Sequence, residues 1–414
     1  MNDYDLATVN LFDPALLAHP HAFYRQALAE APVLRFGESD IYLAASHSVV
    51  FEAFGRPDDF SNDIMSLISG AKSDHPDVAA ILDKGWPQQN VLLGSDPPAH
   101  SRYRKLVNLA FSLKRVDAIE HRIRSIASDL VDQMAQNERC DFVTAFAVPL
   151  PVAMIAGELG LPPEDSERVK RWSTAFVDRL GGMIPLEREI ECAREVVEFQ
   201  HAMKAQIDIR QAEPRDDLLS DLVNARLDGE EPLTIPEMLS IIQQLLVAGN
   251  ESTTNTLSEG LVILMRTPGA LDRLRAETAL IPNAVEEILR ITSAVAGSWR
   301  VVARDCELGG VSLKAGDKLM LRNASANLDP ARFADPETFK PDRNNARTHL
   351  GFGRGIHQCI GNLLARRELA VALEILVDRF SSIELDCAPE TLVYEPNVLL
   401  RGPASVPVRL TLNS

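Results

Sequence analysis

The stretch GFGRGIHQCIG, residues 351–361, gathers four glycines around one cysteine. Cys359 stands just before NLLARRELAVALEIL, whose apolar spacing is typical of a helix. The unpaired N–H groups of a helix N-terminus favour negative charge, and so they favour the thiolate form of a nearby cysteine. Glycine lets a backbone approach a flat ligand closely and turn its N–H groups toward a sulfur atom. The stretch therefore predicts a thiolate held in a tight loop at the start of a helix.

A single thiolate limits the metal centre that this loop can serve. The five cysteines of the chain are scattered and never have CxxC spacing, so a zinc or iron–sulfur site is not expected. One soft axial ligand is what a haem iron needs. Two simpler interpretations stay open at this point. A lone cysteine is often only a small buried hydrophobe, and the glycines suggest a dinucleotide-binding loop, although GxGxxG spacing and a βαβ pattern are both missing.

Composition excludes several classes of function. The 414 residues are 46% hydrophobic and 24% charged, which is ordinary for a globular protein. The 42 basic and 59 acidic residues give a formal net charge of −17, which argues against nucleic acid or anionic membranes as partners. The N-terminus MNDYDLATVNLFDP has no apolar signal-peptide core, and no run of 18 apolar residues predicts a membrane span. The cysteine pattern favours a reducing, cytoplasmic location over a disulfide framework.

The order of elements predicts a mainly α protein with small accessory β-sheets in a single large domain. Helical spacing dominates the middle of the chain, and strand-like segments flank it at 31–46, 300–323 and 397–412. We expect a β-containing part at roughly residues 1–90 and 300–350, and a helical part at roughly 90–290 and 360–380.

One long helix is predicted from a capping box at Thr234–Glu237 to about Arg266. Its centre, AGNESTTN at 248–255, is a cluster of poor helix formers whose side chains compete for backbone hydrogen bonds. We expect a local distortion of the helix at this point, with a functional cause.

The haem interpretation gains weight because the chain resembles the cytochrome P450 family. The family's haem-loop pattern F-x-x-G-x-x-x-C-x-G is met at Phe352, Gly355, Cys359 and Gly361, and the bacterial form's histidine at His357. The E-x-x-R motif matches Glu287 and Arg290, and PDR supplies Arg343 as the usual third, structural partner. DPPAHSRYR at 96–104 resembles the family's C-helix motif, and ANLDP at 326–330 resembles A-N-R-D-P with Leu328 in place of arginine. The resemblance extends from about residue 90 to residue 410.

This resemblance implies a monooxygenase with a haem b cofactor whose iron is bound by Cys359. Dioxygen would be the co-substrate, and NAD(P)H would supply electrons through a reductase. Arginine and histidine side chains would hold the two haem propionates, while Phe352 would shield the sulfur and small residues of the long helix would lie against the haem face. The residues expected to contact the cofactor are Cys359, His100, Arg104, Arg300, His357, Phe352, Gly353, Ala248 and Gly249.

The centre of the long helix would then deliver protons. Glu251 and Ser252 match the family's acid–alcohol pair, and Thr253 follows them. Serine keeps the hydroxyl of the usual threonine but loses the methyl group that restricts its rotamers. We expect retained activity with looser coupling between electron use and product.

The resemblance also implies a substrate and an electron donor. A neutral hydrophobic molecule, terpenoid, aromatic or steroid-like, is expected in a pocket lined by Ile64, Leu67, Gln244, Leu245, Ala248, Val295, Ala296 and Val398. Each of the segments 96–115 and 341–367, which we call the basic segments, holds five arginines or lysines against one aspartate. They predict docking of an acidic ferredoxin near the thiolate side of the haem. A monomer is expected.

Two other functions share part of this pattern. A peroxide-driven haem-thiolate enzyme needs no redox partner, but such enzymes tend to lose the acid–alcohol pair. A non-catalytic haem protein that senses a gas needs Cys359 but no proton relay. Turnover with NAD(P)H and a ferredoxin system, compared with peroxide alone, separates the three.

Overall fold

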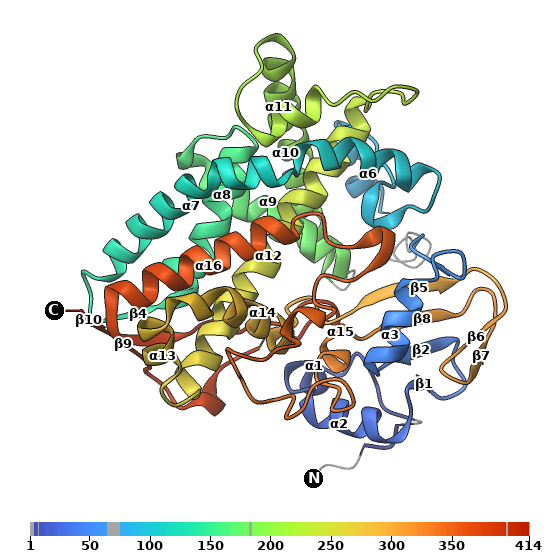
Figure 1. Cartoon of the computed structure of the whole chain (residues 1–414). Coiled ribbons are helices and arrows are strands. Elements are labelled where there is room, and N and C mark those ends of the chain that lie inside the picture. Colours follow the sequence, from blue (N-terminus) through green and yellow to red (C-terminus); the bar gives the residue numbers. More distant parts are fainter. Residues whose placement is uncertain (1–3, 7, 64–74, 182–183, 395, 414) are drawn as a thin grey trace. The chain divides into compact units, whose positions relative to one another are not determined.

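The structure is a computed structural model of the chain, and it describes every residue except 1–3, 7, 64–74, 182–183, 395 and 414 (Figure 1). Two compact units are present. The first, which we call the β-containing unit, comprises Met1–Asn62, Ile123–Val148 and Ser252–Ser414. The second, the helical unit, comprises Asp63–Arg122 and Pro149–Glu251.

The helical unit is built from helices that pack through apolar faces. On α9, Trp172 and Phe176 are one turn apart and therefore share a face, and both rings meet Phe199 of α10 edge-on, with ring centroids 5.5 and 5.0 Å apart. In the described residues, the α-helices of this unit are α5 (Pro76–Leu82), α6 (Ala99–Ala110), the first part of α7 (Leu113–Met134), α8 (Pro149–Glu158), α9 (Ser166–Gly181), α10 (Leu186–Ala212), α11 (Leu218–Val223) and the first half of α12 (Ile235–Arg266).

The β-containing unit holds three small sheets in the described part of the chain. The largest has the strand order β1-β2-β8-β5-β3, in which β2 and β8 are parallel and the other pairs are antiparallel. The strand pair expected near residue 40 is confirmed, with Val33 opposite Ala44. The strands are β1 (Val33–Arg35), β2 (Ile41–Ala44), β3 (Phe60–Ser61), β4 (Arg139–Asp141), β5 (Ser298–Val302), β6 (Cys306–Leu308), β7 (Val311–Leu313), β8 (Lys318–Leu321), β9 (Phe380–Leu385) and β10 (Pro407–Leu412).

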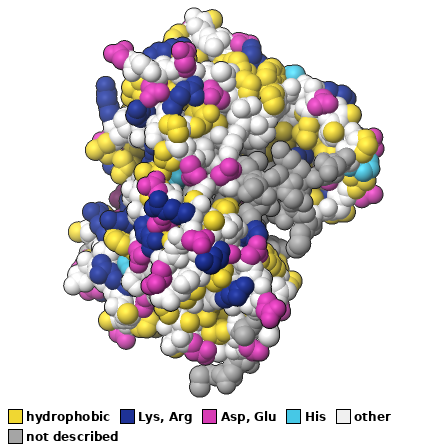
Figure 2. Space-filling view, turned by 90° about the vertical axis from the view of Figure 1, so that its right-hand side faces the viewer, with side chains coloured by type: hydrophobic (Ala, Val, Ile, Leu, Met, Phe, Trp, Pro, Cys, Tyr) yellow, Lys and Arg dark blue, Asp and Glu magenta, His cyan; other side chains and the backbone are white. Residues whose placement is uncertain are grey.

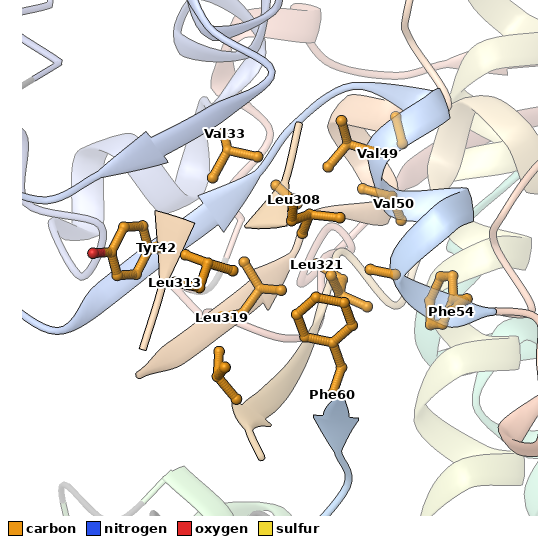
Figure 3. Close-up of a cluster of buried hydrophobic side chains, with 14 of the residues drawn as sticks. Val33, Tyr42, Val49, Val50, Phe54, Phe60, Leu308, Leu313, Leu319 and Leu321 are labelled. Carbon is orange, nitrogen blue, oxygen red and sulfur yellow. The ribbon is translucent and has the colours of Figure 1, made fainter. Parts of the chain in front are cut away.

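Helices cover both faces of the five-stranded sheet. Because side chains alternate along a strand, Leu319 and Leu321 of β8 face one side and Met320 faces the other. The first side packs on Val50 and Phe54 of α3, as Figure 3 shows, and the second side packs on α2. The helices of this unit are α1 (Pro14–Ala18), α2 (His21–Glu30), α3 (His47–Phe54), α13 (Ala270–Ala276), α14 (Ile281–Thr292), α15 (Asn323–Ala326) and α16 (Asn362–Arg379), with the remainders of α7 and α12.

Helix α12 begins and ends where the sequence predicts. The Thr234 N–H donates to Glu237 Oε2 at 2.8 Å, and the Glu237 N–H donates to Thr234 Oγ1 at 3.4 Å, which is a capping box. The expected distortion is wrong, because α12 is one uninterrupted α-helix. One hydroxyl group of the centre and two just beyond it make hydrogen bonds without breaking the helix. Thr256 and Ser258 donate to carbonyls one turn back, and Thr254 donates to Ala147 O.

Among the described helices, none is both long enough and apolar enough to cross a membrane.

Candidate active site

The segment that carries Cys359 is a closed loop between His349 and α16. The Cys359 N–H donates to Phe352 O at 2.9 Å, and the Gly353 N–H donates to Leu350 O at 2.9 Å. These two bonds bring Phe352 beside Cys359, whose side chain is half-buried. Helix α16 begins at Asn362, so Cys359 stands just before its first turn, where the sequence predicts it.

Two glycines of the loop are required by its backbone. Gly353 has a φ of +61° and Gly355 a φ of +71°, in the left-handed region that other residues rarely adopt. A Cβ atom on Gly355 would also lie 2.5 Å from the backbone oxygen of Phe54, at the end of α3. The glycines therefore serve both the turn and its close contact with α3.

The start of the loop is held by the ANLDP segment. Asn327 Oδ1 accepts the Leu350 N–H at 2.7 Å. Asp329 Oδ2 accepts the His47 N–H at 2.9 Å, and the His47 ring lies 3.0 Å from Thr348 O. Leu328, which replaces the family's arginine, is 5% exposed and packs in the core under the sheet. This chain therefore has an apolar contact where the resemblance expects a charged one.

The three residues of the E-x-x-R motif and PDR form one buried cluster. Glu287 accepts hydrogen bonds from Arg290 at 2.7 and 2.8 Å and from Arg343 at 2.7 Å. Arg290 also donates to Asn327 O at 2.8 Å. Buried charges are tolerated only when they are paired in this way. The cluster joins α14 to the ANLDP segment and to the chain before the loop.

The residues expected to hold the haem propionates are divided between the two units. In the β-containing unit, Arg300 of β5 is 5% exposed and its guanidinium lies 5.4 Å from the centre of the Phe54 ring, while His357 is half-buried in the loop. In the helical unit, His100 and Arg104 lie one turn apart on α6. Burial, and then the charge of Arg104, lowers the pKa of His100, so the positive charge on this face at neutral pH comes from Arg104.

The middle of α12 offers space for a flat ligand. Ala248 is exposed although most of the neighbouring helix is covered, and a Cβ atom added to Gly249 would meet no atom within 4 Å. Within the described residues, no three His, Cys, Asp or Glu side chains gather into a metal site. Cys359 supplies one soft ligand, and a porphyrin brings the other ligands of its iron with it. The donor set and the space both fit a haem.

The expected acid of the proton relay is held by two partners that the sequence did not predict. Glu251 Oε1 accepts from Lys170 Nζ at 2.7 Å and from Ser173 Oγ at 3.2 Å, both on α9. Ser252 is half-buried and Thr253 is buried at 4% exposure. No local pattern could have revealed Lys170, because it lies 81 residues from Glu251.

The expected substrate residues have different outcomes. Ile64 and Leu67 lie outside the described residues. Gln244 uses its side-chain amide on the chain itself, donating to Val91 O at 3.1 Å and accepting from the Leu93 N–H at 3.2 Å. Ala296 and Leu245 are 1% and 8% exposed, so they present little surface to a ligand, whereas Val295 and Val398 are half-buried and Ala248 is exposed.

Many cations of the basic segments already have carboxylate partners. In the segment 96–115, Arg102 pairs with Glu237, Lys105 with Glu230, and Arg115 with Asp216 and Asp221. In the segment 341–367, Arg343 pairs with Glu287, and Arg347 and Arg366 pair with Glu286. The net positive charge that these segments present is therefore smaller than their number of arginines and lysines indicates.

Comparison with known proteins gives a consistent result. The family model described as Cytochrome P450 matches residues 186–406. The steroid C26-monooxygenase of Mycobacterium tuberculosis is 35% identical over 409 residues, which cover 99% of this chain and 97% of that protein. The mycinamicin IV hydroxylase/epoxidase of Micromonospora griseorubida is 41% identical over 320 residues, which cover 77% of this chain and 79% of that protein.

Solved structures agree with the sequence matches. The structure of cytochrome P450 CYP109Q5 from Chondromyces apiculatus has a TM-score of 0.86 at 33% identity, and the match covers 99% of this chain and 100% of that one. The predicted fold, mainly α with small accessory sheets in a single domain, is confirmed by this likeness.

Proposed function

The chain belongs to the cytochrome P450 family and is a haem-thiolate monooxygenase, and on this premise we propose that it hydroxylates a bulky, neutral, hydrophobic molecule with electrons from a ferredoxin-type protein. Family membership implies a haem, dioxygen and a reducing partner. We also propose that the haem is haem b, and that NAD(P)H supplies the electrons through a reductase. The observation that carries it is the half-buried Cys359 in a closed loop at the N-terminus of α16.

The loop prepares Cys359 to bind iron. A bound haem supplies the iron centre at which dioxygen is activated. The hydrogen bond from the Cys359 N–H to Phe352 O fixes the backbone at the sulfur-bearing residue. Phe352 would cover the sulfur, while Gly353 leaves room beside it. Arg300, His357, His100 and Arg104 are the proposed propionate ligands.

The proposed proton path uses two neighbouring residues of α12. Ser252 Oγ would donate a proton into the pocket, and the Glu251 carboxylate would replace it from solvent. Lys170 and Ser173 both contact Oε1 of Glu251, so they fix the orientation of the carboxylate. Thr253, buried at the next position, is proposed to support the relay beside Ser252 without replacing it as the donor.

The relatives support a bulky substrate. Two of them are named for a steroid and for mycinamicin IV, and the small side chain of Ala248 leaves space along α12. Val295 and Val398 remain as apolar contacts in the proposed pocket. Gln244 is proposed to shape that pocket by its hydrogen bonds to the backbone of residues 91–93, and not by contacting the substrate.

We further propose that the protein works as a cytoplasmic monomer in which the whole chain forms one catalytic domain. Its electron donor would be an acidic ferredoxin bound by exposed cations of the basic segments, among them Lys114, Arg347 and Arg354. The scattered spacing of the five cysteines supports the location, and the formal charge of −17 argues against binding to nucleic acid.

A two-step experiment tests this function. Optical spectroscopy with a panel of steroids and macrocyclic lactones should detect the spin-state change that follows displacement of water from the iron. The best ligand should then yield a product that carries one added oxygen atom when NAD(P)H, a ferredoxin and its reductase are present. Product from hydrogen peroxide alone, with none from the ferredoxin system, would favour the peroxide-driven alternative. A spectral response without product in either system would favour a haem sensor.

A further inference from the structure

We propose that Glu286 is a positioning residue that fixes the loop carrying Cys359 by holding both of its ends. Glu286 precedes the E-x-x-R glutamate on α14, and its side chain is 1% exposed. Glu287 accepts from Arg290, Arg343 and the Lys340 N–H, and Glu286 forms a separate network with other partners. The inference rests on the proposed function, in which Cys359 binds the haem iron.

The first contact of Glu286 holds the beginning of the loop. Its Oε2 lies 3.1 Å from Nε2 of His349, and both side chains are 1% exposed. The Gly351 N–H donates to His349 Nδ1 at 3.0 Å. Because Nδ1 must accept that hydrogen bond, the proton of a neutral ring lies on Nε2 and faces Glu286. The carboxylate therefore selects the tautomer that lets His349 hold the Gly351 backbone.

The second contact of Glu286 holds the end of the loop. Arg366 donates from Nε to Oε1 at 2.7 Å and from Nη2 to Oε2 at 3.1 Å. The same guanidinium donates to Asn362 Oδ1 at 2.8 Å, and Asn362 Nδ2 donates to Cys359 O at 2.6 Å. Three hydrogen-bonded steps thus join the Glu286 carboxylate to the backbone of Cys359. Arg366 also covers the Phe352 ring, with its guanidinium 4.5 Å from the ring centre.

The charges of this network are matched. Burial alone would raise the pKa of Glu286, but hydrogen bonds from His349 and Arg366 outweigh it and lower the pKa to about 2. Burial lowers the pKa of His349. At neutral pH the network is therefore a carboxylate between a neutral imidazole and a guanidinium, with the exposed Arg347 3.4 Å from Oε1. Both carboxylate oxygens are used, so a side chain with a single acceptor oxygen cannot replace Glu286.

The test is Glu286→Gln in the haem-loaded protein. Glutamine keeps the shape but has one acceptor oxygen and no charge, so His349 and Arg366 compete for it. We expect haem transfer to apomyoglobin to accelerate on the order of 10-fold, as for other outer-shell partners of a metal ligand. We also expect a larger share of the ferrous carbonyl complex to lose the absorption band of thiolate ligation during incubation.

Two controls separate positioning from general stability. Glu374→Gln removes a half-exposed carboxylate of α16 that pairs with Arg124, and should leave both readouts unchanged. Asp217→Asn breaks the buried pair with Arg210 in the helical unit, and should lower thermal stability without changing the carbonyl band of the folded protein. Should Glu286→Gln fail to fold, Arg366→Lys carries the test, because lysine keeps the charge but cannot bind Glu286 and Asn362 in the same forked geometry. It should accelerate haem transfer in the same way.

The outcomes are distinct. Haem transfer within twofold of wild type for Glu286→Gln or, in its place, Arg366→Lys would overturn the inference. A rise that merely follows lost thermal stability, as in Asp217→Asn, would overturn it too. If the ferrous carbonyl complex of the wild-type protein lacks the band of thiolate ligation, the proposed function is wrong and the inference loses its premise. This failure is seen in the wild type alone, so it is distinct from any effect of the variants.

Discussion

At the scale of single residues, the serine at position 252 makes the most specific prediction about chemistry. Ser252→Ala removes the proposed donor, so electrons should be lost as hydrogen peroxide and the product formed per NAD(P)H consumed should fall several-fold. Ser252→Thr restores a hydroxyl with a restricted rotamer and should match or exceed wild type. Product and peroxide are measured together in the reconstituted system. An unchanged yield in Ser252→Ala would exclude this residue from the relay.

Glu368 of α16 predicts a pH effect on stability. Its side chain is 4% exposed, and burial raises its pKa to about 8. The folded protein therefore keeps a proton that the unfolded chain loses near pH 4.5, so this group's contribution to stability falls as pH rises from about 4.5 to about 8. Glu368→Gln should match wild type near pH 5 and gain on the order of 4 kcal/mol near pH 8.

Urea unfolding at the two pH values measures this difference. Glu374→Gln, a half-exposed position on the same helix, is the control and should show no pH-dependent gain. If the gain of Glu368→Gln were the same at both pH values, the carboxyl group would not be held protonated in the fold.

The sequence could identify site residues only where a motif carries them. Cys359, Glu287 and Arg290 belong to patterns with fixed spacing, and Glu287 and Arg290 form a buried pair. Glu286 was missed because its partner His349 lies 63 residues away, and the spacing is set by the path of the chain and not by one element. A second glutamate directly before the E-x-x-R glutamate was the available clue, and alone it suggests no partner.

At the scale of elements, side chains of α12 make hydrogen bonds that fix the backbone of residues 89–93, before α6. Glu237 binds Arg102, Ser240 accepts the Gln89 N–H at 2.9 Å, and Gln244 brackets Leu92 through the residues on either side. Leu92 has a φ of +35°, which is unfavourable for leucine. The side-chain amide of Gln244 thus holds a strained backbone in place.

Gln244→Ala should release that backbone. Each lost hydrogen bond is worth about 1 kcal/mol, so amide exchange at Leu93 should accelerate about 10-fold while amides in the centre of α10 stay protected. Hydrogen exchange read by mass spectrometry measures the effect. Gln243→Ala is the matched control, since adjacent helix positions do not share a face. Equal exchange in both variants would mean that Gln244 does not restrain this segment.

The behaviour of α12 also marks a limit of reasoning from propensity. The capping box and the length of the helix were predictable from residues 234–266, because both depend on local hydrogen bonds and spacing. The expected distortion did not form: α12 is uninterrupted, while the hydroxyls of Thr254 and Thr256 donate to Ala147 O and Ser252 O. Whether such a stretch distorts the helix or leaves it uninterrupted depends on packing against other elements, and the local sequence does not encode that packing.

At the scale of the whole molecule, charge should govern the encounter with an electron donor. Acidic and basic side chains are intermixed on the face seen in Figure 2, in keeping with the many ion pairs of the basic segments. We expect the rate of reduction by an acidic ferredoxin to fall several-fold as ionic strength rises from about 0.05 M to about 0.5 M. Stopped-flow reduction measures it, with dithionite as the control donor. A rate that ignores salt would contradict electrostatic docking.

The architecture of the molecule was predictable in outline and not in detail. Alternating strands near residues 33–44 and helical spacing over the middle of the chain give the mainly α class directly. The strand order β1-β2-β8-β5-β3 was beyond prediction, because β2 and β8 are parallel neighbours far apart in the chain. The prediction of the pocket residues was limited for the same reason. Ala296 lies in the core, and its burial depends on how α15 and β8 pack against it.

The central claim is that the sulfur of Cys359 binds the haem iron. The ferrous carbonyl spectrum of protein purified after haem-replete expression tests it most directly, with Cys192→Ser as a control for loss of a buried cysteine elsewhere. The account predicts the red-shifted band of thiolate ligation in wild type and in the control, and its loss in Cys359→His. A wild-type protein that binds no haem, or whose carbonyl band is that of imidazole ligation, would contradict it.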